Sequence, residues 1–387
     1  MNNDKDFCIF ALEHYQSLYE RIVEYNLADS SVKCVSTGEW LDDDEKMAFL
    51  NTGLFYPEVN GTQELRTAIS KLYTNATASN ILVTVGASQA NNLVCQTLLN
   101  SGDHVVVMSP GYRQVWGLAK NMGCTVHDLQ LQEKSGWRID LDQLDCLVPG
   151  NTKLVSVVNP NNPTGTVLTT AEMESIVAVC RRVGAWLHVD EVYHGTEHSG
   201  VDAAPSFWGM YDKLVCTNSL SKAYGLSGLR IGWAIAPPDV VESLWRRHEY
   251  SVIAAAAPSM ALAELALRPA KRAALLERQR RITQAGLAVL REWLPAQAGL
   301  FSLQPTQATS IVLLRCHLPL PSLALAEAVR TRASVLVAPG AALGAEHHIR
   351  VTVGYEPDKV RAALDRIAAV ARSLAAAAAD SPPADAA

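Results

Sequence analysis

Short runs of strand-forming residues alternate with helical segments through the middle of the chain, and this alternation limits the possible folds more than any other feature. Residues 89–99 and 170–183 carry apolar side chains at helical spacing. Strands that alternate with helices favour a mainly parallel sheet with helices on both faces. We therefore predict an α/β fold in which a mainly parallel sheet is sandwiched by helices. Its expected strands are residues 81–85, 104–108, 154–158, 186–189, 214–217 and 231–235.

The composition changes after Pro269, which predicts a second, smaller α+β domain. Residues 271–294 are rich in alanine, leucine and arginine with helical periodicity, as in a long connecting helix. The expected strands of the small domain are 311–315, 335–338 and 349–353. Its expected closing helix, 356–378, presents one apolar face formed by Val360, Leu364, Ile367, Val370 and Leu374.

These patterns divide the chain into four parts. Residues 1–41 are expected to join the small domain, residues 42–269 to form the large domain, and residues 270–379 to form the connecting helix and the small domain. The alanine-rich tail at 380–387 is expected to be disordered.

Composition and charge exclude several classes of partner. With 387 residues, 49% apolar and 19% charged, the chain can bury a large core and a second one. A net charge of -6 without a dense lysine and arginine cluster argues against nucleic-acid or acidic-membrane binding. Eight cysteines scattered without a C-x-x-C pair indicate a reducing cytoplasm, and no metal site is expected. We find no signal peptide and no apolar run of about eighteen residues.

Lys222 is the strongest candidate for a catalytic residue. It lies in the string Ser-Leu-Ser-Lys-Ala-Tyr-Gly-Leu-Ser-Gly-Leu-Arg, which ends at Arg230. A lysine amine becomes a nucleophile only when its pKa is lowered, by burial or by a nearby cation such as Arg230. The string therefore favours an amine that holds an aldehyde cofactor, with Arg230 also available to a phosphate.

Other polar residues follow the predicted strands, at the edge where α/β sheets bind ligands. In Asn-Pro-Asn-Asn-Pro-Thr-Gly, the Asn162 amide could donate to a ring oxygen, although the segment could also be a simple turn. Asp190 could keep a nitrogen heterocycle protonated, or it could cap a helix while Tyr193 packs in the core. Glu191 should point the other way, and His188 is expected to be a hydrogen-bonded core histidine.

Further candidates would bind anions or a flat ring. Ser88 lies where a strand turns into a helix, an arrangement that suits phosphate but also occurs for steric and capping reasons. Tyr112 could stack on a ring or pack in the core. Arg350 is a cation in an apolar run, so it needs either a substrate carboxylate or an internal salt bridge.

Taken together and in this order, these segments resemble the pyridoxal-phosphate (PLP) enzymes of fold type I, the aminotransferase class I/II superfamily. The resemblance covers residues 25–374. Its most specific parts are Asn-Asn-Pro-Thr-Gly, Asp-Glu-Val-Tyr, and Ser-Leu-Ser-Lys with an arginine eight residues after the lysine.

The resemblance implies a role for each residue. Lys222 would form the imine with PLP, Asp190 would bind the pyridinium nitrogen, and Asn162 with Tyr193 would hold the phenolic oxygen. Arg350 would bind the substrate carboxylate, with Asn162 nearby. Tyr56 would reach the phosphate of the neighbouring subunit, which implies a homodimer with shared active sites. The other implied cofactor-binding residues are Ala87, Ser88, Ser219 and Arg230 at the phosphate, and Tyr112 at the ring face.

The expected activity is PLP-dependent conversion of an L-amino acid through external aldimine and quinonoid intermediates, of the aminotransferase type and in specialised metabolism. The alternative is β- or γ-elimination with replacement or cyclisation. Residues 25–32 replace the usual Asn-Pro-x-Gly stretch and, with Ser-Lys-Ala-Tyr-Gly-Leu-x-Gly-Leu-Arg, resemble the capreomycidine synthase branch. A PLP-sensing transcription factor is disfavoured, because the residues before the large domain are few and not basic.

Overall fold

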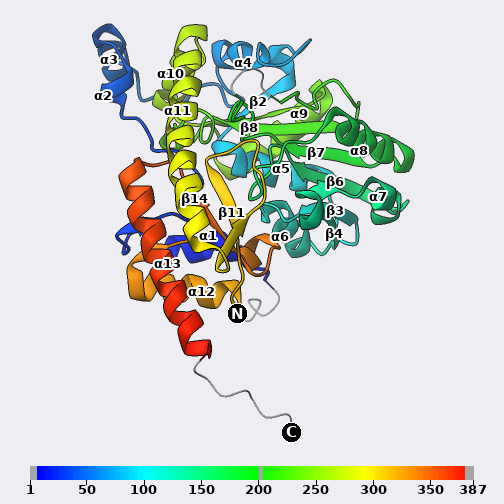
Figure 1. Ribbon diagram of the computed structural model, residues 1–387. Helices are drawn as coiled ribbons and strands as arrows, with labels where there is room; N and C mark the ends of the chain where they lie inside the picture. Colours follow the sequence, from blue (N-terminus) through cyan, green and yellow to red (C-terminus); the bar gives the residue numbers. More distant parts are fainter. Residues whose placement is uncertain (1–6, 200–203, 380–387) are drawn as a thin grey trace, which may run out of the picture.

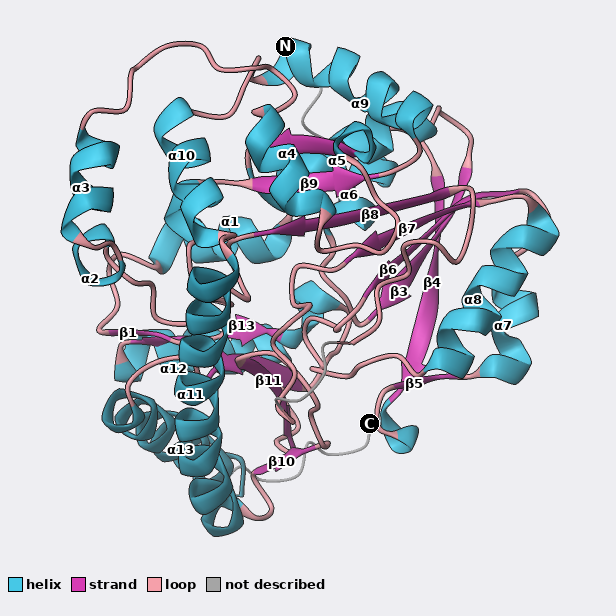
Figure 2. Cartoon of the chain, turned by 90° about the horizontal axis from the view of Figure 1, so that it is seen from above, coloured by secondary structure: helices cyan, strands magenta, loops and turns pink. Residues whose placement is uncertain are grey.

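The computed structural model describes residues 7–199 and 204–379, and a large twisted sheet dominates it (Figures 1 and 2). Within these residues, eight strands follow the order β2-β9-β8-β7-β6-β3-β4-β5. Strands β8, β7, β6, β3 and β4 are parallel neighbours, whereas β9 is antiparallel to β8 and β2, and β5 to β4. The predicted α/β fold with a mainly parallel sheet is confirmed. The strands are β2 (Ile81–Thr84), β3 (His104–Ser109), β4 (Thr125–Gln132), β5 (Arg138–Ile139), β6 (Thr152–Val158), β7 (Trp186–Asp190), β8 (Leu214–Ser219) and β9 (Gly232–Ile235).

All six predicted strands of this sheet are present, but β4 and β5 were not predicted. The reason is the position of β4 near the sheet edge. Only Leu129 and Leu131 of this strand are buried, and the other residues are partly or fully exposed. Its polar sequence, Thr-Val-His-Asp-Leu-Gln-Leu-Gln, therefore lacks the continuous apolar run of a central parallel strand.

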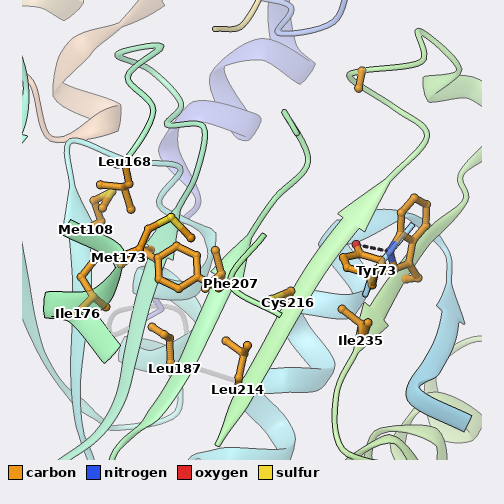
Figure 3. Packing of buried hydrophobic residues seen from close by; sticks show 14 of the residues in the cluster. Tyr73, Met108, Leu168, Met173, Ile176, Leu187, Phe207, Leu214, Cys216 and Ile235 are labelled. Atoms are coloured by element: carbon orange, nitrogen blue, oxygen red, sulfur yellow. Dashed lines mark hydrogen bonds between the residues drawn. The ribbon is translucent and has the colours of Figure 1, made fainter. Parts of the chain in front are cut away.

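Alternate residues of each central strand face two separate apolar cores. In β3, Val105 and Val107 pack under α5, α6 and α9, whereas Val106 and Met108 pack under α4, α7, α8 and α10. Figure 3 shows part of the second core, where Phe207 and Leu187 lie among the strands and Tyr73 accepts a hydrogen bond. The helices are α4 (Gln63–Ser70), α5 (Gly86–Leu98), α6 (Gln114–Asn121), α7 (Leu141–Leu147), α8 (Thr170–Val183), α9 (Pro238–Ser251) and α10 (Ala257–Ala266).

A smaller antiparallel sheet in the order β10-β11-β14-β13 packs against α12, α13 and the second half of α11. Helix α11 links the two cores, because Leu275 and Leu276 lie in the large one and Leu287 and Leu290 in the small one (Figure 1). The elements are α11 (Pro269–Trp293), β10 (Phe301–Leu303), β11 (Ile311–Cys316), α12 (Ser322–Ala333), β13 (Ala338–Pro339), β14 (His348–Thr352) and α13 (Pro357–Ala379).

One predicted strand of the small domain is corrected. Residues 335–338 form two short strands in different sheets, since β12 (Val335–Leu336) pairs with β1 (Tyr25–Asn26) while Ala338 pairs with Arg350 of β14. All these residues are buried, so the apolar run does not reveal the change of partner. The closing helix α13 buries the predicted face, with Leu374 half-buried at its end.

The first part of the N-terminal segment, α1 (Ala11–Tyr19) and β1, is bound to the small domain. The following helices α2 (Thr37–Trp40) and α3 (Asp43–Leu50) lie against α10 and the beginning of α11. Besides the β1–β12 pairing, the Thr352 amide donates to the Leu27 carbonyl at 2.8 Å, and the Lys33 amide to the Gly354 carbonyl at 2.7 Å. The domain boundaries at 41/42 and 269/270 stay predictions, and the tail at 380–387 lies outside the described residues. None of the described helices is both long and apolar enough to cross a membrane.

Gly286 of α11 should tolerate no side chain. A Cβ atom there would lie 2.0 Å from the Val353 carbonyl oxygen, so Gly286→Ala must push α11 away from β14. We expect it to lower the free energy of unfolding by about 1–3 kcal/mol, measured by urea denaturation. Gly117→Ala in α6 is the control, because no atom lies within 4 Å of its Cβ position. That helical substitution should be neutral or stabilise by about 0.5–1 kcal/mol. Equal urea midpoints for the two variants would contradict this close packing.

Candidate active site

Nine residues singled out in the sequence line one cavity of about 430 Å³ at an edge of the large sheet. This volume lies within the usual range of small-molecule sites, about 300–1,000 Å³. Two other candidates, Tyr56 and Arg350, do not line it directly. The nine are Ala87, Ser88, Tyr112, Asn162, Asp190, Tyr193, Ser219, Lys222 and Arg230.

The direction of the strands explains this convergence. Strands β6, β7 and β8 are parallel, so Asn162, Asp190 and Ser219 all lie at or just beyond the same edge. Strand β9 runs the opposite way and therefore begins at this edge, directly after Arg230. Residues far apart in the sequence thus surround one cavity.

Asp190 is a buried carboxylate held by a hydrogen-bond network. Its Oδ2 accepts from Asn91 Nδ2 at 2.9 Å, and its Oδ1 from the Val192 amide at 3.1 Å. Burial raises the pKa of Asp190, while these hydrogen bonds and Lys222 act in the opposite direction. No ion pair within 4 Å involves Asp190 in the part of the chain described. A cation in the cavity would therefore stabilise its ionised form.

A second layer fixes the Asn91 side chain. Its Oδ1 accepts from Thr217 Oγ1 at 2.7 Å and lies 3.1 Å from His188 Nε2. The other ring nitrogen of His188 lies 2.9 Å from Ser156 Oγ, across the β6–β7 pair. His188 is thus a hydrogen-bonded core histidine, as expected. Since Thr217 and His188 occupy the Asn91 oxygen, the Asn91 amide is directed at Asp190.

Lys222 lies in the cavity, half-buried. Its Nζ donates to Ser30 Oγ at 2.9 Å and to Ser31 Oγ at 3.3 Å. Burial lowers the pKa of Lys222, and the Arg350 and Arg230 charges lower it further, while Asp29 acts against them. A lowered pKa leaves more of the amine unprotonated, as an imine-forming nucleophile requires.

The beginning of α5 lines the same cavity as Lys222 and has the groups that an anion requires. The helix begins at Gly86, three residues earlier than predicted, so the Ala87 and Ser88 amides belong to its first turn and point out of its positive end. A Cβ atom on Gly86 would lie 2.3 Å from Arg230 Nη2, so only glycine lets the guanidinium approach. Arg230 itself has φ 53°, a left-handed conformation that costs about 1 kcal/mol or more.

Arg350 lies behind the cavity wall. It is 1% exposed, and its Nη1 donates to Asn162 Oδ1 at 3.0 Å, which leaves the Asn162 amide free to donate elsewhere. Its Nε has no hydrogen-bond partner. Within residues 7–199 and 204–379 Arg350 forms no ion pair, so the internal salt bridge that the sequence left open is absent. An unpaired buried guanidinium nitrogen is a binding position for a carboxylate.

Three aromatic candidates differ in their surroundings. Tyr193 is buried and donates to the Ser30 carbonyl at 3.1 Å, and burial raises its pKa to about 12. Tyr112 donates to Glu13 Oε1 at 2.9 Å and contacts the edge of Phe10. Tyr56 is 83% exposed and lies outside the cavity of its own chain. Glu191 points away, as expected, and accepts from Ser206 and the Phe207 amide.

Sequence reasoning missed several residues of the cavity. Asn91 is one of two adjacent asparagines in a helix. Its one signal in the sequence was its position five residues after Gly86, in the turn that leads into that helix. Glu13, Asp29 and Ser30 come from the N-terminal segment, whose position depends on the β1–β12 pairing. That pairing joins residues about three hundred positions apart, and no local pattern reveals it.

Comparisons with known proteins agree on one family. Residues 39–367 match aminotransferase class I and II. The chain is 28% identical to the arginine–pyruvate transaminase of Pseudomonas aeruginosa, over 82% of this chain and 83% of that protein. It is also 28% identical to the capreomycidine synthase of Streptomyces vinaceus, over 75% and 74%. The crystal structure of a PLP-dependent aminotransferase from Streptococcus suis has 30% identity and a TM-score of 0.88, with 95% of this chain and 98% of that one covered.

The comparisons imply PLP as the cofactor, and the cavity fits it in three respects. The buried Asp190 carboxylate needs a cation, which a protonated pyridine nitrogen supplies. The beginning of α5 and Arg230 form a phosphate cradle that the Cβ of any other residue at position 86 would fill. The half-buried Lys222 amine has a lowered pKa, which suits an aldehyde.

Burial of neutral His188 should make stability depend on pH. Burial lowers its pKa from 6.5 to about 3, so the unfolded chain binds a proton first and stability falls as pH drops from about 6.5 toward 3. At pH 5 we expect a loss of about 2 kcal/mol relative to pH 7 from this group. The free energy of unfolding of His188→Gln, measured in urea at pH 7 and pH 5, should fall by about 2 kcal/mol less than that of the natural protein. His127→Gln, which removes an exposed histidine, should keep the dependence of the natural protein. If the stability of His188→Gln falls between pH 7 and pH 5 as much as that of the natural protein, His188 is not the source of the pH dependence.

Proposed function

The chain belongs to the aminotransferase class I and II family, and we propose that it transfers the amino group of an L-amino acid by PLP-dependent transamination, in specialised metabolism. The observation that carries the proposal is the meeting of Lys222 and Asp190 in one cavity, next to an anion cradle. The eight cysteines are free, which supports a reducing cytoplasmic location.

Bound PLP supplies an aldehyde for the substrate amine and an electron-accepting ring. Asp190, held by Asn91, would keep the ring nitrogen protonated, and the Asn162 amide and the Tyr193 hydroxyl would hold the phenolic oxygen. Ala87, Ser88, Ser219 and Arg230 would hold the phosphate, and Tyr112 would cover the ring face.

Arg350 and Lys222 handle the substrate. The unpaired Nε of Arg350 binds the α-carboxylate, next to Asn162, and fixes the orientation of the Cα–H bond. The Lys222 amine would carry the proton that leaves the substrate Cα. Its partners Ser30 and Ser31 keep the free amine in place.

One observation favours the second candidate, elimination or cyclisation of the side chain. The segment that replaces Asn-Pro-x-Gly places the hydroxyls of Ser30 and Ser31 against Lys222 Nζ. These hydroxyls could hold the proton-carrying amine toward the substrate side chain instead of the cofactor carbon. The similarity to a capreomycidine synthase supports this candidate.

A single turnover should separate the two reactions. Holoenzyme mixed with amino acids, without an acceptor, should lose the absorbance of the aldehyde cofactor and accumulate pyridoxamine phosphate. The Lys222→Ala variant should not convert the aldehyde cofactor to pyridoxamine phosphate, because it lacks the amine that carries the proton. After borohydride reduction it should have no cofactor attached at position 222, because it also lacks the amine that forms the imine. Arg268→Ala, an exposed change away from the cavity, is the control. Unchanged cofactor with loss of a side-chain group would instead support elimination.

We further propose a homodimer with shared active sites. Large apolar residues on α3 and the following loop are exposed, including Leu50, Leu54 and Phe55 at 74, 90 and 65%. Helices α2 and α3 lie at the outer edge of the molecule (Figure 1). A second copy would cover this surface, and Tyr56 at its end would reach the partner's phosphate.

Mixing variants should test the shared site. Tyr56→Phe removes one phosphate hydrogen bond and should weaken PLP affinity about tenfold, measured by fluorescence titration. In mixed dimers with Lys222→Ala, the subunit that keeps Lys222 receives an intact Tyr56, so its affinity should return to that of the natural protein. Tyr250→Phe, which is 96% exposed on α9, is the matched control. Mixed dimers without recovery, or a monomer by light scattering, would disprove the shared site.

A further inference from the structure

Three carboxylates line the candidate cavity in addition to Asp190, and all three belong to the N-terminal segment. They are Glu13 on α1, Glu20 at its end and Asp29 after β1. From them we propose that the enzyme selects an amino acid whose side chain ends in a positive charge, a guanidinium or an amine. The inference rests on the proposed function, which places the reacting end of the substrate at Lys222.

The two glutamates occupy one face of α1. Glu20 follows Glu13 by seven positions, which corresponds to about two helical turns, and Gln16 lies between them on the same face. Helix α1 therefore forms a wall of the cavity with two acidic groups and one amide. Because α1 packs on the small sheet through Leu12, this face has a fixed direction.

Asp29 lies close to the reacting amine. It is two residues before Ser31, whose Oγ is 3.3 Å from Lys222 Nζ. Asp29 Oδ1 accepts from the Ser31 amide at 2.9 Å, and Oδ2 accepts from Tyr355 at 3.2 Å. Burial alone would raise the pKa of Asp29, but the Lys222 charge and these hydrogen bonds more than offset it. Asp29 is therefore ionised at neutral pH.

In the described residues none of the three carboxylates forms an ion pair within 4 Å with a buried cation, although the Lys222 charge acts on Asp29 from farther away. Glu13 accepts only from the Tyr112 hydroxyl, which is neutral. Glu20 lies 3.6 Å from Arg21, whose side chain is 91% exposed, so that pair is weak. A carboxylate has about four acceptor positions, so each of the three can accept further hydrogen bonds.

The cations of the cavity have other functions. Arg230 belongs to the proposed phosphate cradle, and Lys222 is the proposed cofactor amine. Arg350, at the proposed α-carboxylate position, is 1% exposed and keeps only its Nε without a hydrogen-bond partner. An amino acid held there extends its side chain toward the remaining walls, and the acidic N-terminal segment forms part of them. The charge left over on these walls is negative.

Charge therefore determines which side chains fit. An acidic side chain would meet three like charges, and an apolar one would remove these carboxylates from water without offering a donor. A guanidinium or ammonium group donates to them directly, and such charge-assisted hydrogen bonds are roughly twice as strong as neutral ones. The arrangement thus selects for a cationic side chain and against an acidic one.

The test compares holoenzyme turnover of arginine, lysine, citrulline, leucine and glutamate. We expect kcat/KM for arginine or lysine to exceed that for citrulline by about 10- to 100-fold, since hydrogen bonds to charged groups contribute about 1.5–3 kcal/mol. Citrulline has nearly the shape of arginine without its charge, so the ratio isolates the charge. The comparison of arginine with lysine distinguishes a guanidinium from an amine.

The acidic residues are then tested by isosteric variants. Asp29→Asn keeps an oxygen for the Ser31 amide and should lower the arginine-to-citrulline ratio about tenfold. Because Asp29 also acts on the pKa of Lys222, the readout for this variant is the ratio of the two substrates and not turnover of either one. Glu20→Gln, at the partly exposed end of α1, carries little risk to folding and should lower the ratio less. Glu174→Gln, exposed on α8, removes the same charge outside the cavity and should leave the ratio intact.

The possible failures are distinguishable. If no amino acid reacts or changes the cofactor absorbance, the proposed function is wrong and this inference with it. If citrulline, leucine or glutamate reacts as well as arginine and lysine, transamination stands and the cationic preference is wrong. If Asp29→Asn and Glu20→Gln lower kcat/KM equally for all the amino acids, the carboxylates have only a structural role. That result would overturn the assignment of substrate specificity to them.

Discussion

The buried carboxylate of Asp190 imposes the strictest requirement in this molecule. A charge at the end of a central strand is costly unless donors and a cation surround it. Asn91, Thr217 and His188 meet the first need, because each fixes the next through a hydrogen bond between α5 and the strands β7 and β8. In the described residues no cation lies within 4 Å of Asp190, and in our proposal a protonated ring meets the second need. The neutral core histidine, costly at low pH, follows from the same network.

The remaining charges divide the cavity into regions. The beginning of α5 and Arg230 form the proposed phosphate position, and Arg350 with Asn162 the proposed carboxylate position. Lys222 lies near both arginines, so its pKa is lowered by burial first and by their charges second. Asp29 opposes that effect. Asp29 therefore influences the reactive amine and, in our proposal, also the distal end of a substrate, which would couple substrate selection to amine reactivity.

How far the sequence predicts this arrangement depends on which contacts are local. The strands of the large sheet have apolar runs and the candidate residues follow them directly, so the parallel topology alone brings Asn162, Asp190 and Lys222 together. Asn91 escaped prediction because its partners lie on other elements. Likewise, β4 is too polar for a central strand, and residues 335–338 change sheets within an unbroken apolar run. Sequence patterns indicate which residues are buried and whether a segment is a helix or a strand. They do not indicate which distant element that segment contacts.

The N-terminal segment has a different attachment from the rest of the cavity. Lys222, Asp190 and the phosphate cradle belong to the large sheet, whereas α1 and residues 29–31 are held by β12, β14 and the small core. Changes in this segment can therefore alter the wall that faces a substrate side chain without moving the groups that bind the cofactor. Since Arg350 also lies on β14, the α-carboxylate position and the acidic wall are fixed to the same sheet. If the two proposed positions bind the two ends of a substrate, the small sheet sets the distance between them, and the large sheet holds the residues proposed for the chemistry.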